Sequence, residues 1–187
     1  GLAYIALLYA IAKLKEKYTE SEINSKFFST LANSDSLTGA YSRLKILELL
    51  DFYVENSRLH SQPLSIMLID VDKLKETNDR FGHDAGDFVL SNLVDKLKVN
   101  LREHDAIGRI GGDEFLVISP KTSEDQANGL AVRLNEIINS TGFSALDKQS
   151  ISIGVATLHD NDTRKSLIKR ADINMYDDKN SKRIARL

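Results

Sequence analysis

The pattern of apolar and polar positions divides the chain into strand-like and helix-like segments. Residues 64–71 (LSIMLIDV) are almost continuously apolar, which is typical of a central strand buried on both faces. Two shorter apolar runs, 106–110 and 114–118, flank a pair of glycines. They predict a β-hairpin, because a two-residue turn needs positive φ angles that glycine adopts without strain. Residues 151–158 (ISIGVATL) predict a further strand.

Helices are predicted between these strands, where apolar residues recur at three- and four-residue steps. Ser42 is a suitable N-cap for a helix that reaches about Arg58. Residues 82–86 open a strongly periodic helix, and further helices are predicted around 127–138 and 163–179. From the first strand onward the order is strand, helix, hairpin, helix, strand, helix. This order predicts an α+β domain with a mainly antiparallel sheet backed by helices.

The N-terminal segment follows a different pattern. Residues 2–12 (LAYIALLYAIA) are apolar, but a membrane span needs about 20 such residues, and the segment does not have the layout of a signal peptide. Because lysines follow at once, it reads as the tail of a truncated membrane helix with its cytoplasmic flank, or else as a dimerising coiled coil. The coiled-coil alternative rests on a heptad-like series, namely Tyr4, Leu7, Ile11, Leu14 and Tyr18. We expect residues 1–33 to be a helical extension and residues 34–187 a separate domain.

Composition excludes several classes of function. The 187 residues are 42% hydrophobic and 28% charged, which suits one core-forming domain with an extra helix. The net charge of −2 provides no bulk basic field for nucleic acid. The chain has no cysteine, so disulfides and thiolate chemistry are excluded.

Acidic residues stand at the ends of two predicted strands. Asp70 ends the buried strand, where a bare carboxylate is costly unless it is paired or binds a metal. Asp113 and Glu114 follow the glycine pair, and taken alone such a pair is most often a solvated hairpin end. If the hairpin pairs beside the first strand, Asp70 and Asp113 meet at one edge of the sheet. Mg²⁺ bound by carboxylates together with substrate phosphates would then relieve their mutual repulsion.

Five segments resemble, in order, the motifs of GGDEF-type diguanylate cyclases, namely 35–39 (DSLTG), 70–79 (DVDKLKETND), 82–87 (GHDAGD), 109–115 (RIGGDEF) and 171–179 (ADINMYDDK). The resemblance covers about residues 34–183. It implies a nucleotide-cyclase or polymerase-palm-like fold and an enzyme that joins two GTP molecules into cyclic di-GMP.

The resemblance also implies a metal site. Mg²⁺ would be bound by the carboxylates of Asp70, Asp113 and Glu114 and by the backbone carbonyl of Val71. Two ions are implied for each half-site, with Mn²⁺ able to substitute. Glu114 would bind the second ion or activate the 3′-hydroxyl, the alternative being an acid that only supports the metal ligands. Lys75 is counted with the catalytic residues because it would neutralise phosphate charge.

Other residues are implied to bind GTP. Backbone amides around Lys73 and Leu74 would cradle the β- and γ-phosphates, as at a helix N-terminus. Asn78 and Asp87 would read the guanine edge, because Asp accepts hydrogen bonds from N1–H and N2–H₂, donors that adenine lacks. The implied set is completed by the glycine pair, a supporting histidine and two cations of the last helix, namely Gly111, Gly112, His83, Lys179 and Arg183.

The sequence departs from the family pattern at three places. Leu74 stands where the family usually has Phe, and Ile110 where it usually has an aromatic residue, so both positions stay apolar. Lys182 and Ile184 replace the usual Gly and Asn on either side of Arg183. This last departure argues against the family's terminal hairpin, and the position of Arg183 depends on whether that hairpin forms.

Residues 102–105 (REHD) resemble the family's RxxD inhibitory site. Arg102 and Asp105 are implied to bind cyclic di-GMP, with Arg133 on the following helix as a second arginine. The alternative is an ordinary charge cluster at a helix end. The resemblance favours the inhibitory site, so product inhibition is expected.

The leading hypothesis is therefore a diguanylate cyclase that works as a homodimer, because each monomer supplies half a site for one GTP. The rival hypotheses are a catalytically inactive receptor for cyclic di-GMP or GTP and a purely structural dimerisation domain. We expect a cytoplasmic catalytic domain with no nucleic-acid partner and an upstream sensor domain before Gly1. The catalytic domain would belong to a membrane-anchored protein if the N-terminal segment is the tail of a membrane helix.

Overall fold

The computed structural model describes residue 1 and residues 11–19, 33–141 and 150–184. The chain forms two compact units, residues 1–33 and Ser34–Leu187. In the first unit, residues 11–19 are helical. Of the heptad-like series, Ile11, Leu14 and Tyr18 are exposed, whereas Tyr4 and Leu7 lie outside the described residues. Among the described helices, none combines the length and the apolar character that crossing a membrane requires.

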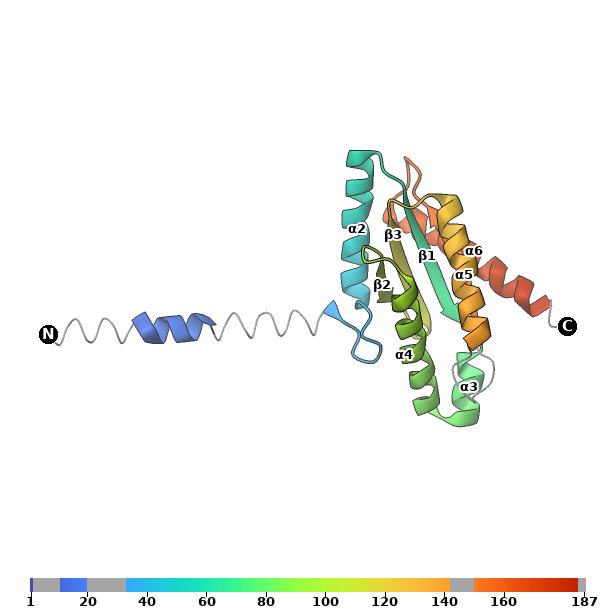
Figure 1. Ribbon diagram of the computed structural model, residues 1–187, viewed down its shortest axis with the longest axis horizontal. Coiled ribbons are helices and arrows are strands. Elements are labelled where there is room, and N and C mark those ends of the chain that lie inside the picture. Colours follow the sequence, from blue (N-terminus) through green and yellow to red (C-terminus); the bar gives the residue numbers. More distant parts are fainter. Residues whose placement is uncertain (2–10, 20–32, 142–149, 185–187) are drawn as a thin grey trace. The chain divides into compact units, whose positions relative to one another are not determined.

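The second unit is built on an antiparallel sheet, which in the described residues has the strand order β2-β3-β1-β4 (Figure 1). Its strands are β1 Leu64–Val71, β2 Ala106–Arg109, β3 Glu114–Pro120 and β4 Ile151–Thr157. All eight residues of β1 are buried, and the strand pairs with β3 on one side and β4 on the other. The predicted central strand is confirmed.

The helices of this unit are α2 Arg43–His60, α3 Leu74–Phe81, α4 His83–Asn100, α5 Glu124–Thr141 and α6 Arg164–Ile184. Ser42 caps α2, since its hydroxyl accepts a hydrogen bond from the amide of Lys45. The predicted α+β class is confirmed. The sequence pattern did not predict α3 as a helix of its own, because it is polar and buries only Leu74 and Thr77. The pattern also ended α6 about five residues too early.

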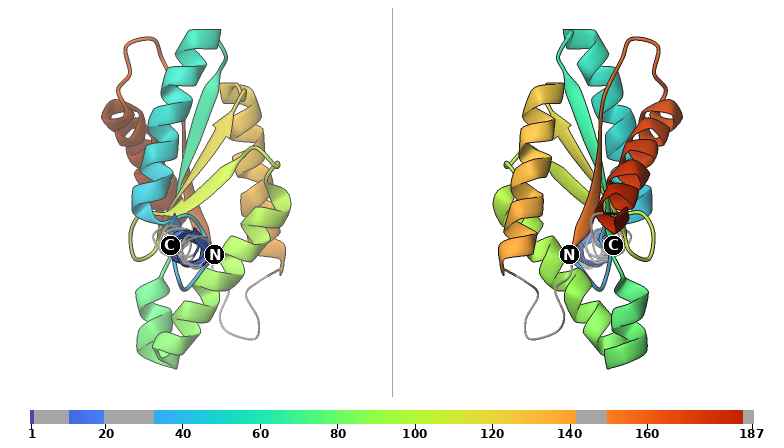
Figure 2. Two further views of the ribbon diagram at one scale, coloured as in Figure 1. Left: turned by 90° about the vertical axis from the view of Figure 1, so that its left-hand side faces the viewer. Right: turned by 90° about the vertical axis from the view of Figure 1, so that its right-hand side faces the viewer.

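The helices form a layer on each face of the sheet (Figure 2). Residues of α4 and α5 pack with Met67 and Ile69 of β1, whereas residues of α2 and α6 pack with Ile66 and Leu68. Successive side chains of a strand point to opposite faces. Asp70, two residues beyond Leu68, therefore lies on the face that α6 covers.

The last helix approaches the sheet closely at Gly154 of β4. A Cβ atom at this position would lie 1.9 Å from the carbonyl oxygen of Ala171 and 2.2 Å from the amide nitrogen of Met175. Only glycine allows such a contact between a helix backbone and a strand. The contact fixes the height of α6 above the sheet one turn before Lys179.

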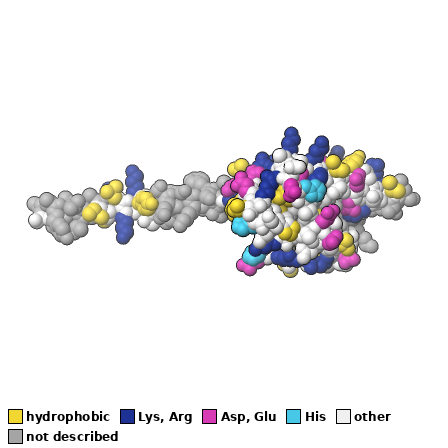
Figure 3. Space-filling model, turned by 90° about the horizontal axis from the view of Figure 1, so that it is seen from above, with side chains coloured by type: hydrophobic (Ala, Val, Ile, Leu, Met, Phe, Trp, Pro, Cys, Tyr) yellow, Lys and Arg dark blue, Asp and Glu magenta, His cyan; other side chains and the backbone are white. Residues whose placement is uncertain are grey.

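Charged side chains of both signs are interspersed on the face of the second unit that Figure 3 shows. This view matches the small net charge of the chain. A mixed surface of this kind gives no support to a large nucleic-acid interface on that face.

Candidate active site

Three carboxylates lie together where β1 ends and β3 begins. Asp70 and Glu114 are direct partners in the β1–β3 ladder. Asp113 immediately precedes β3, and its carbonyl accepts a hydrogen bond of 3.1 Å from the amide of Val71. Asp70 is buried and Glu114 is half-buried. The antiparallel register thus brings Asp70 together with two acids that follow it by 43 and 44 residues in the sequence.

A cation from α6 completes this cluster. Lys179 donates a hydrogen bond of 2.6 Å to Oδ1 of Asp70. Burial lowers the pKa of the Lys179 ammonium, but the contact with Asp70 and the charges of Asp72 and Asp113 outweigh burial, so the net shift is upward. Lys179 is thereby kept charged.

The acids themselves resist ionisation. Burial raises the pKa of the Asp70 carboxyl above its usual range, a rise that Lys179 opposes and that Asp113 and Asp72 reinforce. The pKa of Glu114 is raised by burial first, and then by negative charges that include Asp113. Clustered carboxylates in a partly dry site therefore carry excess negative charge that a cation would neutralise.

The donor set fits a hard divalent cation. Asp70, Asp113, Glu114 and the carbonyl of Val71 offer only oxygen, which Mg²⁺ prefers. Within residues 11–19, 33–141 and 150–184, no three acidic, His or Cys side chains already surround a common point as metal ligands. Nucleotide phosphates would therefore have to complete the coordination, as is usual for Mg²⁺ at phosphate sites.

The prediction of a two-residue turn in the loop that carries Asp113 is wrong. Four residues separate β2 from β3, and neither Gly111 nor Gly112 has a φ in the left-handed range. The loop is held instead by the guanidinium of Arg109, whose Nη2 donates to the carbonyl of Gly112 at 2.7 Å. A Cβ atom at Gly111 would lie 2.5 Å from Oε2 of Glu114. The glycine at 111 thus makes room for the acid.

A cavity of about 440 Å³ lies between α3 and the end of α6, and Lys179, which contacts Asp70, is part of its lining. Its lining is mostly charged and consists of Asp72, Lys73, Glu76, Tyr176, Lys179, Asn180, Lys182 and Arg183. Lys73 is the N-cap of α3 and has a left-handed φ of 60°. Of the cations predicted to meet phosphate, Lys179 and Arg183 line this cavity, whereas Lys75 is exposed on α3 and is not part of the lining.

The predicted guanine-reading residues lie on α3 and α4. Oδ1 of Asn78 is buried and has no hydrogen-bond partner among the described residues. Gly86 on α4 faces it, since a Cβ atom there would lie 1.9 Å from this oxygen. Asp87 and His83 are exposed on the first turns of α4. A buried acceptor without a partner is costly, and a ligand that donates to it would remove the cost.

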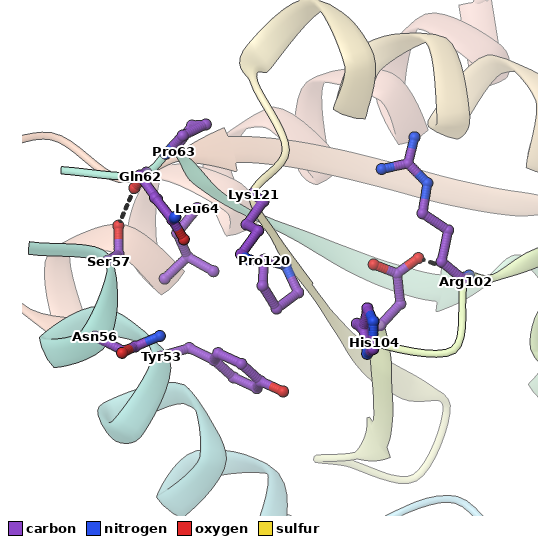
Figure 4. A pocket seen from close by; sticks show the side chains of 11 residues that line it. Tyr53, Asn56, Ser57, Gln62, Pro63, Leu64, Arg102, His104, Pro120 and Lys121 are labelled. Atoms are coloured by element: carbon purple, nitrogen blue, oxygen red, sulfur yellow. Dashed lines mark hydrogen bonds between the residues drawn. The ribbon is translucent and has the colours of Figure 1, made fainter. Parts of the chain in front are cut away.

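Arg102 and Asp105 line a different cavity, of about 360 Å³. Figure 4 shows Tyr53 and Asn56 of α2 on one side of it and Arg102 with His104 on the other. Asp105 does not pair with the Arg102 guanidinium. Its carboxylate accepts a hydrogen bond of 2.9 Å from the backbone amide of Arg102 and closes the turn.

Arg133, predicted as the second arginine of this site, lies nearby without lining the cavity. Its guanidinium donates to the carbonyl of Asn100 at 2.9 Å, two residues before Arg102. The structure therefore brings Arg133 to the same turn, where it binds the end of α4.

A family model described as "Diguanylate cyclase, GGDEF domain" matches residues 32–184, most of the chain. The chain belongs to this family. Among curated proteins, response regulator PleD of Caulobacter vibrioides is 38% identical to this GGDEF domain over 178 residues, which are 91% of this chain and 39% of PleD. The chain spans about two fifths of the length of PleD and of probable diguanylate cyclase DgcC of Escherichia coli.

Solved structures resemble the GGDEF domain in fold as well. Diguanylate cyclase SiaD of Pseudomonas aeruginosa, solved with its activator SiaC, is 30% identical with a TM-score of 0.76, and the match covers 95% of this chain and 70% of SiaD. A microbial GGDEF domain solved with cyclic di-GMP is 33% identical with a TM-score of 0.73, and the match covers 82% of this chain and 94% of that one. The palm-like fold is confirmed.

Three residues of this GGDEF domain were not assigned a role from the sequence. Asp35, in the N-terminal turn, pairs with Arg109 at 3.3 Å and so ties that turn to the loop of Asp113. Asp172 on α6 adds to the negative charge that raises the pKa of Glu114. Arg43 at the start of α2 donates to the carbonyl of Ile110 at 2.8 Å. The chemical type of these residues gave no signal, because only the folded chain brings them to the site.

Proposed function

We propose that this GGDEF domain is a diguanylate cyclase that condenses two GTP molecules into cyclic di-GMP and two pyrophosphates. The observation that carries the proposal is the acidic edge formed by Asp70, Asp113 and Glu114 beside a cavity lined by Lys179 and Arg183. Acids that favour a divalent cation, next to cations that favour phosphate, suit a nucleoside triphosphate. Membership of the family supports the same reaction.

The reaction consists of two equivalent phosphoryl transfers. In each, the 3′-oxygen of one GTP forms a bond to the α-phosphorus of the other, and the bond from that phosphorus to the bridging oxygen breaks, so that pyrophosphate leaves. The hydroxyl proton passes to a base, and Glu114 is suited to accept it because its raised pKa makes it a stronger base than an ordinary carboxylate. One domain holds one nucleotide, so two copies must face each other as a homodimer.

The chain's own residues bind and orient the triphosphate. Mg²⁺, two ions in each half-site or Mn²⁺ in their place, would be held by Asp70, Asp113, Glu114 and the carbonyl of Val71 and would stabilise charge on the reacting phosphates. Lys179 would exchange its contact with Asp70 for the phosphates. We assign the remaining predicted phosphate contacts to three groups that frame the cavity and the loop, namely the amides of Lys73 and Leu74, the ammonium of Lys75 and the backbone of Gly111 and Gly112.

Selectivity for guanine would come from α3 and α4. Asp87 would accept hydrogen bonds from N1–H and N2–H₂, and the free acceptor of Asn78 would take a further donor of the base. His83 would support this turn. Adenine offers neither donor to Asp87, so ATP should be a poor substrate.

Product inhibition is part of the proposal. Cyclic di-GMP would occupy the cavity beside Arg102, with Asp105 and Arg133 at the same turn. Because that cavity is separate from the acidic edge, the product would act at a distance from the reacting groups. We also propose that the domain works in the cytoplasm under the control of an upstream sensor.

The proposal is tested by incubating the purified protein with GTP or ATP and Mg²⁺ and separating the nucleotides by chromatography. We expect cyclic di-GMP to form with GTP, and no cyclic dinucleotide to form with ATP. The rate per protein molecule should rise with protein concentration as dimers form. If a verified dimer binds guanine nucleotides and makes no cyclic di-GMP, the proposal is wrong and the receptor hypothesis replaces it.

A further inference from the structure

The last turn of α6 is fastened to the rest of the domain by the side chain of Lys182. Its ammonium donates to three acceptors at once: the carbonyl of Ile151 at 2.6 Å, Oδ2 of Asp178 at 2.6 Å and Oδ1 of Asn135 at 3.1 Å. These groups belong to the first residue of β4, to the preceding turn of α6 and to α5. An ammonium has three N–H donors. All three are therefore used.

The partner Asp178 strengthens this connection. Its Oδ2 also accepts a hydrogen bond of 2.9 Å from the amide of Ile153 on β4. Lys182 and Asp178 are four residues apart and thus lie on one face of the helix. Both are largely covered, with side chains 25% and 30% exposed, so their contacts are less screened than those of a surface pair.

Arg183, the neighbour of Lys182, has no such contacts within the part of the chain that the structure describes. Arg183 lines the 440 Å³ cavity and forms no hydrogen bond or ion pair with any described residue. The helix reaches Ile184, so Arg183 lies one turn beyond Lys179. Without an anchor, the final turn of a helix frays readily. The contacts of Lys182 anchor this turn at the residue directly before Arg183.

Lys182 also lines the cavity, so a direct contact with phosphate is the obvious competing role. Its three acceptors argue against that role, because phosphate binding would have to break at least one of them. Lys179 differs, since the one hydrogen bond of its ammonium to a described residue is to Asp70, and its side chain is 43% exposed. The two lysines of the cavity therefore have different tasks.

We infer that Lys182 is a positioning residue for the triphosphate: it keeps α6 helical past Lys179 and so holds Arg183 where the β- and γ-phosphates would lie. The inference rests on the proposed function, which places GTP in this cavity. It also explains how the chain tolerates a lysine where relatives are expected to turn into a hairpin.

The test compares binding of 3′-deoxy-GTP, which lacks the attacking hydroxyl and cannot react, with binding of GMP, which lacks the β- and γ-phosphates. We expect Lys182→Met to raise the Kd of 3′-deoxy-GTP about tenfold, the loss of one charge-assisted hydrogen bond, and to leave the Kd of GMP unchanged. Lys182→Arg should restore part of the affinity. Lys169→Met, at an exposed position of the same helix, is the matched control and should change neither Kd.

A double-mutant cycle separates positioning from direct contact. If Lys182 acts through Arg183, the variant carrying both Lys182→Met and Arg183→Ala binds 3′-deoxy-GTP no more weakly than Arg183→Ala alone. Additive losses, or equal losses for GMP and 3′-deoxy-GTP, would overturn the inference. Asn135→Ala removes one anchor without altering α6 and should give a smaller loss in the same direction, which keeps the test available if Lys182→Met does not fold.

The wild-type protein distinguishes this inference from the proposed function. If it binds 3′-deoxy-GTP no better than GMP, the cavity does not hold the triphosphate and both ideas fail together. If the wild type does prefer 3′-deoxy-GTP and Lys182→Met keeps that preference in full, only the role of Lys182 is wrong.

Discussion

The ammonium of Lys179 lies 2.6 Å from Oδ1 of Asp70, so a cation of the last helix pairs with the acid that ends the central strand. The side chain of Lys179 has more room to move than that of Asp70, because it is 43% exposed and that of Asp70 only 10%. Asp70 is fixed in the ladder between β3 and β4. In the proposed function, the Lys179 side chain therefore moves to a phosphate while the Asp70 carboxylate stays in place for a cation.

Replacing Lys179 by methionine should weaken nucleotide binding. The variant loses an ammonium that lines the 440 Å³ cavity, where we propose that the phosphates bind, and we expect the Kd of 3′-deoxy-GTP to rise about tenfold, as for one charge-assisted contact. Isothermal titration calorimetry measures this directly, with Lys169→Met as the matched control. An unchanged Kd would mean that Lys179 serves only to neutralise Asp70.

Glu114→Gln should separate stability from activity. The folded domain raises the pKa of Glu114, so its ionised form destabilises the metal-free protein at neutral pH. The variant should therefore have a higher Tm than the wild type in EDTA, while cyclase activity is lost. The Tm difference should vanish as the pH falls through the raised pKa and below the ordinary glutamate pKa of 4.5, because both proteins are then neutral at this position. A lower Tm for the variant at neutral pH would contradict this.

Gly86→Ala should impair guanine recognition specifically. Its Cβ would collide with Oδ1 of Asn78, and this side chain can move away, so the fold should survive while the acceptor is displaced. We expect the KM for GTP to rise about tenfold or more, on the scale of a lost hydrogen bond. Gly129→Ala on α5, where a Cβ meets nothing within 4 Å, is the matched control and should leave KM unchanged. Equal KM values for both variants would remove Asn78 from the guanine site.

Much of the fold could be predicted because its signals are local. The continuous apolar run of 64–71 identifies β1, and the Ser42 cap marks the start of α2. The short helix α3 was missed because a polar eight-residue segment buries too little to show a period. The end of α6 was missed for a different reason, since Lys182 finds its partners on α5 and β4, which the sequence does not place beside it.

The sequence predicts which types of residue form the site, but it predicts their spatial arrangement less well. The sequence predicted that Asp70 meets Asp113 on the condition that the hairpin pairs beside the first strand, and the structure shows this pairing between β1 and β3. The pairing of Asp35 with Arg109 joins residues 74 apart and has no local signal. Likewise, the glycine at 111 was interpreted through backbone angles, whereas the structure uses it for space beside Glu114.

Arg102→Ala should abolish product inhibition without reducing the uninhibited rate. The residue lines the 360 Å³ cavity, away from the acidic edge, and its guanidinium has no hydrogen-bond partner among the described residues. We expect the initial rate with GTP to stay constant as cyclic di-GMP is added, whereas the wild-type rate falls. Arg164→Ala, an arginine of α6 that pairs with Asp51, is the control and should keep the inhibition. A variant that is still inhibited would place the inhibitory site elsewhere.

The central claim is that the acidic edge carries out the condensation of GTP. The most direct measurement is the yield of cyclic di-GMP and pyrophosphate from GTP and Mg²⁺ by the wild-type dimer and by Asp113→Asn, with folding of both checked by their thermal unfolding. We predict one cyclic di-GMP for every two pyrophosphates from the wild type and a loss of at least about a hundredfold in rate for Asp113→Asn, as expected when metal-dependent charge stabilisation is removed. Wild-type turnover that survives in Asp113→Asn would contradict the assignment of this edge as the catalytic centre.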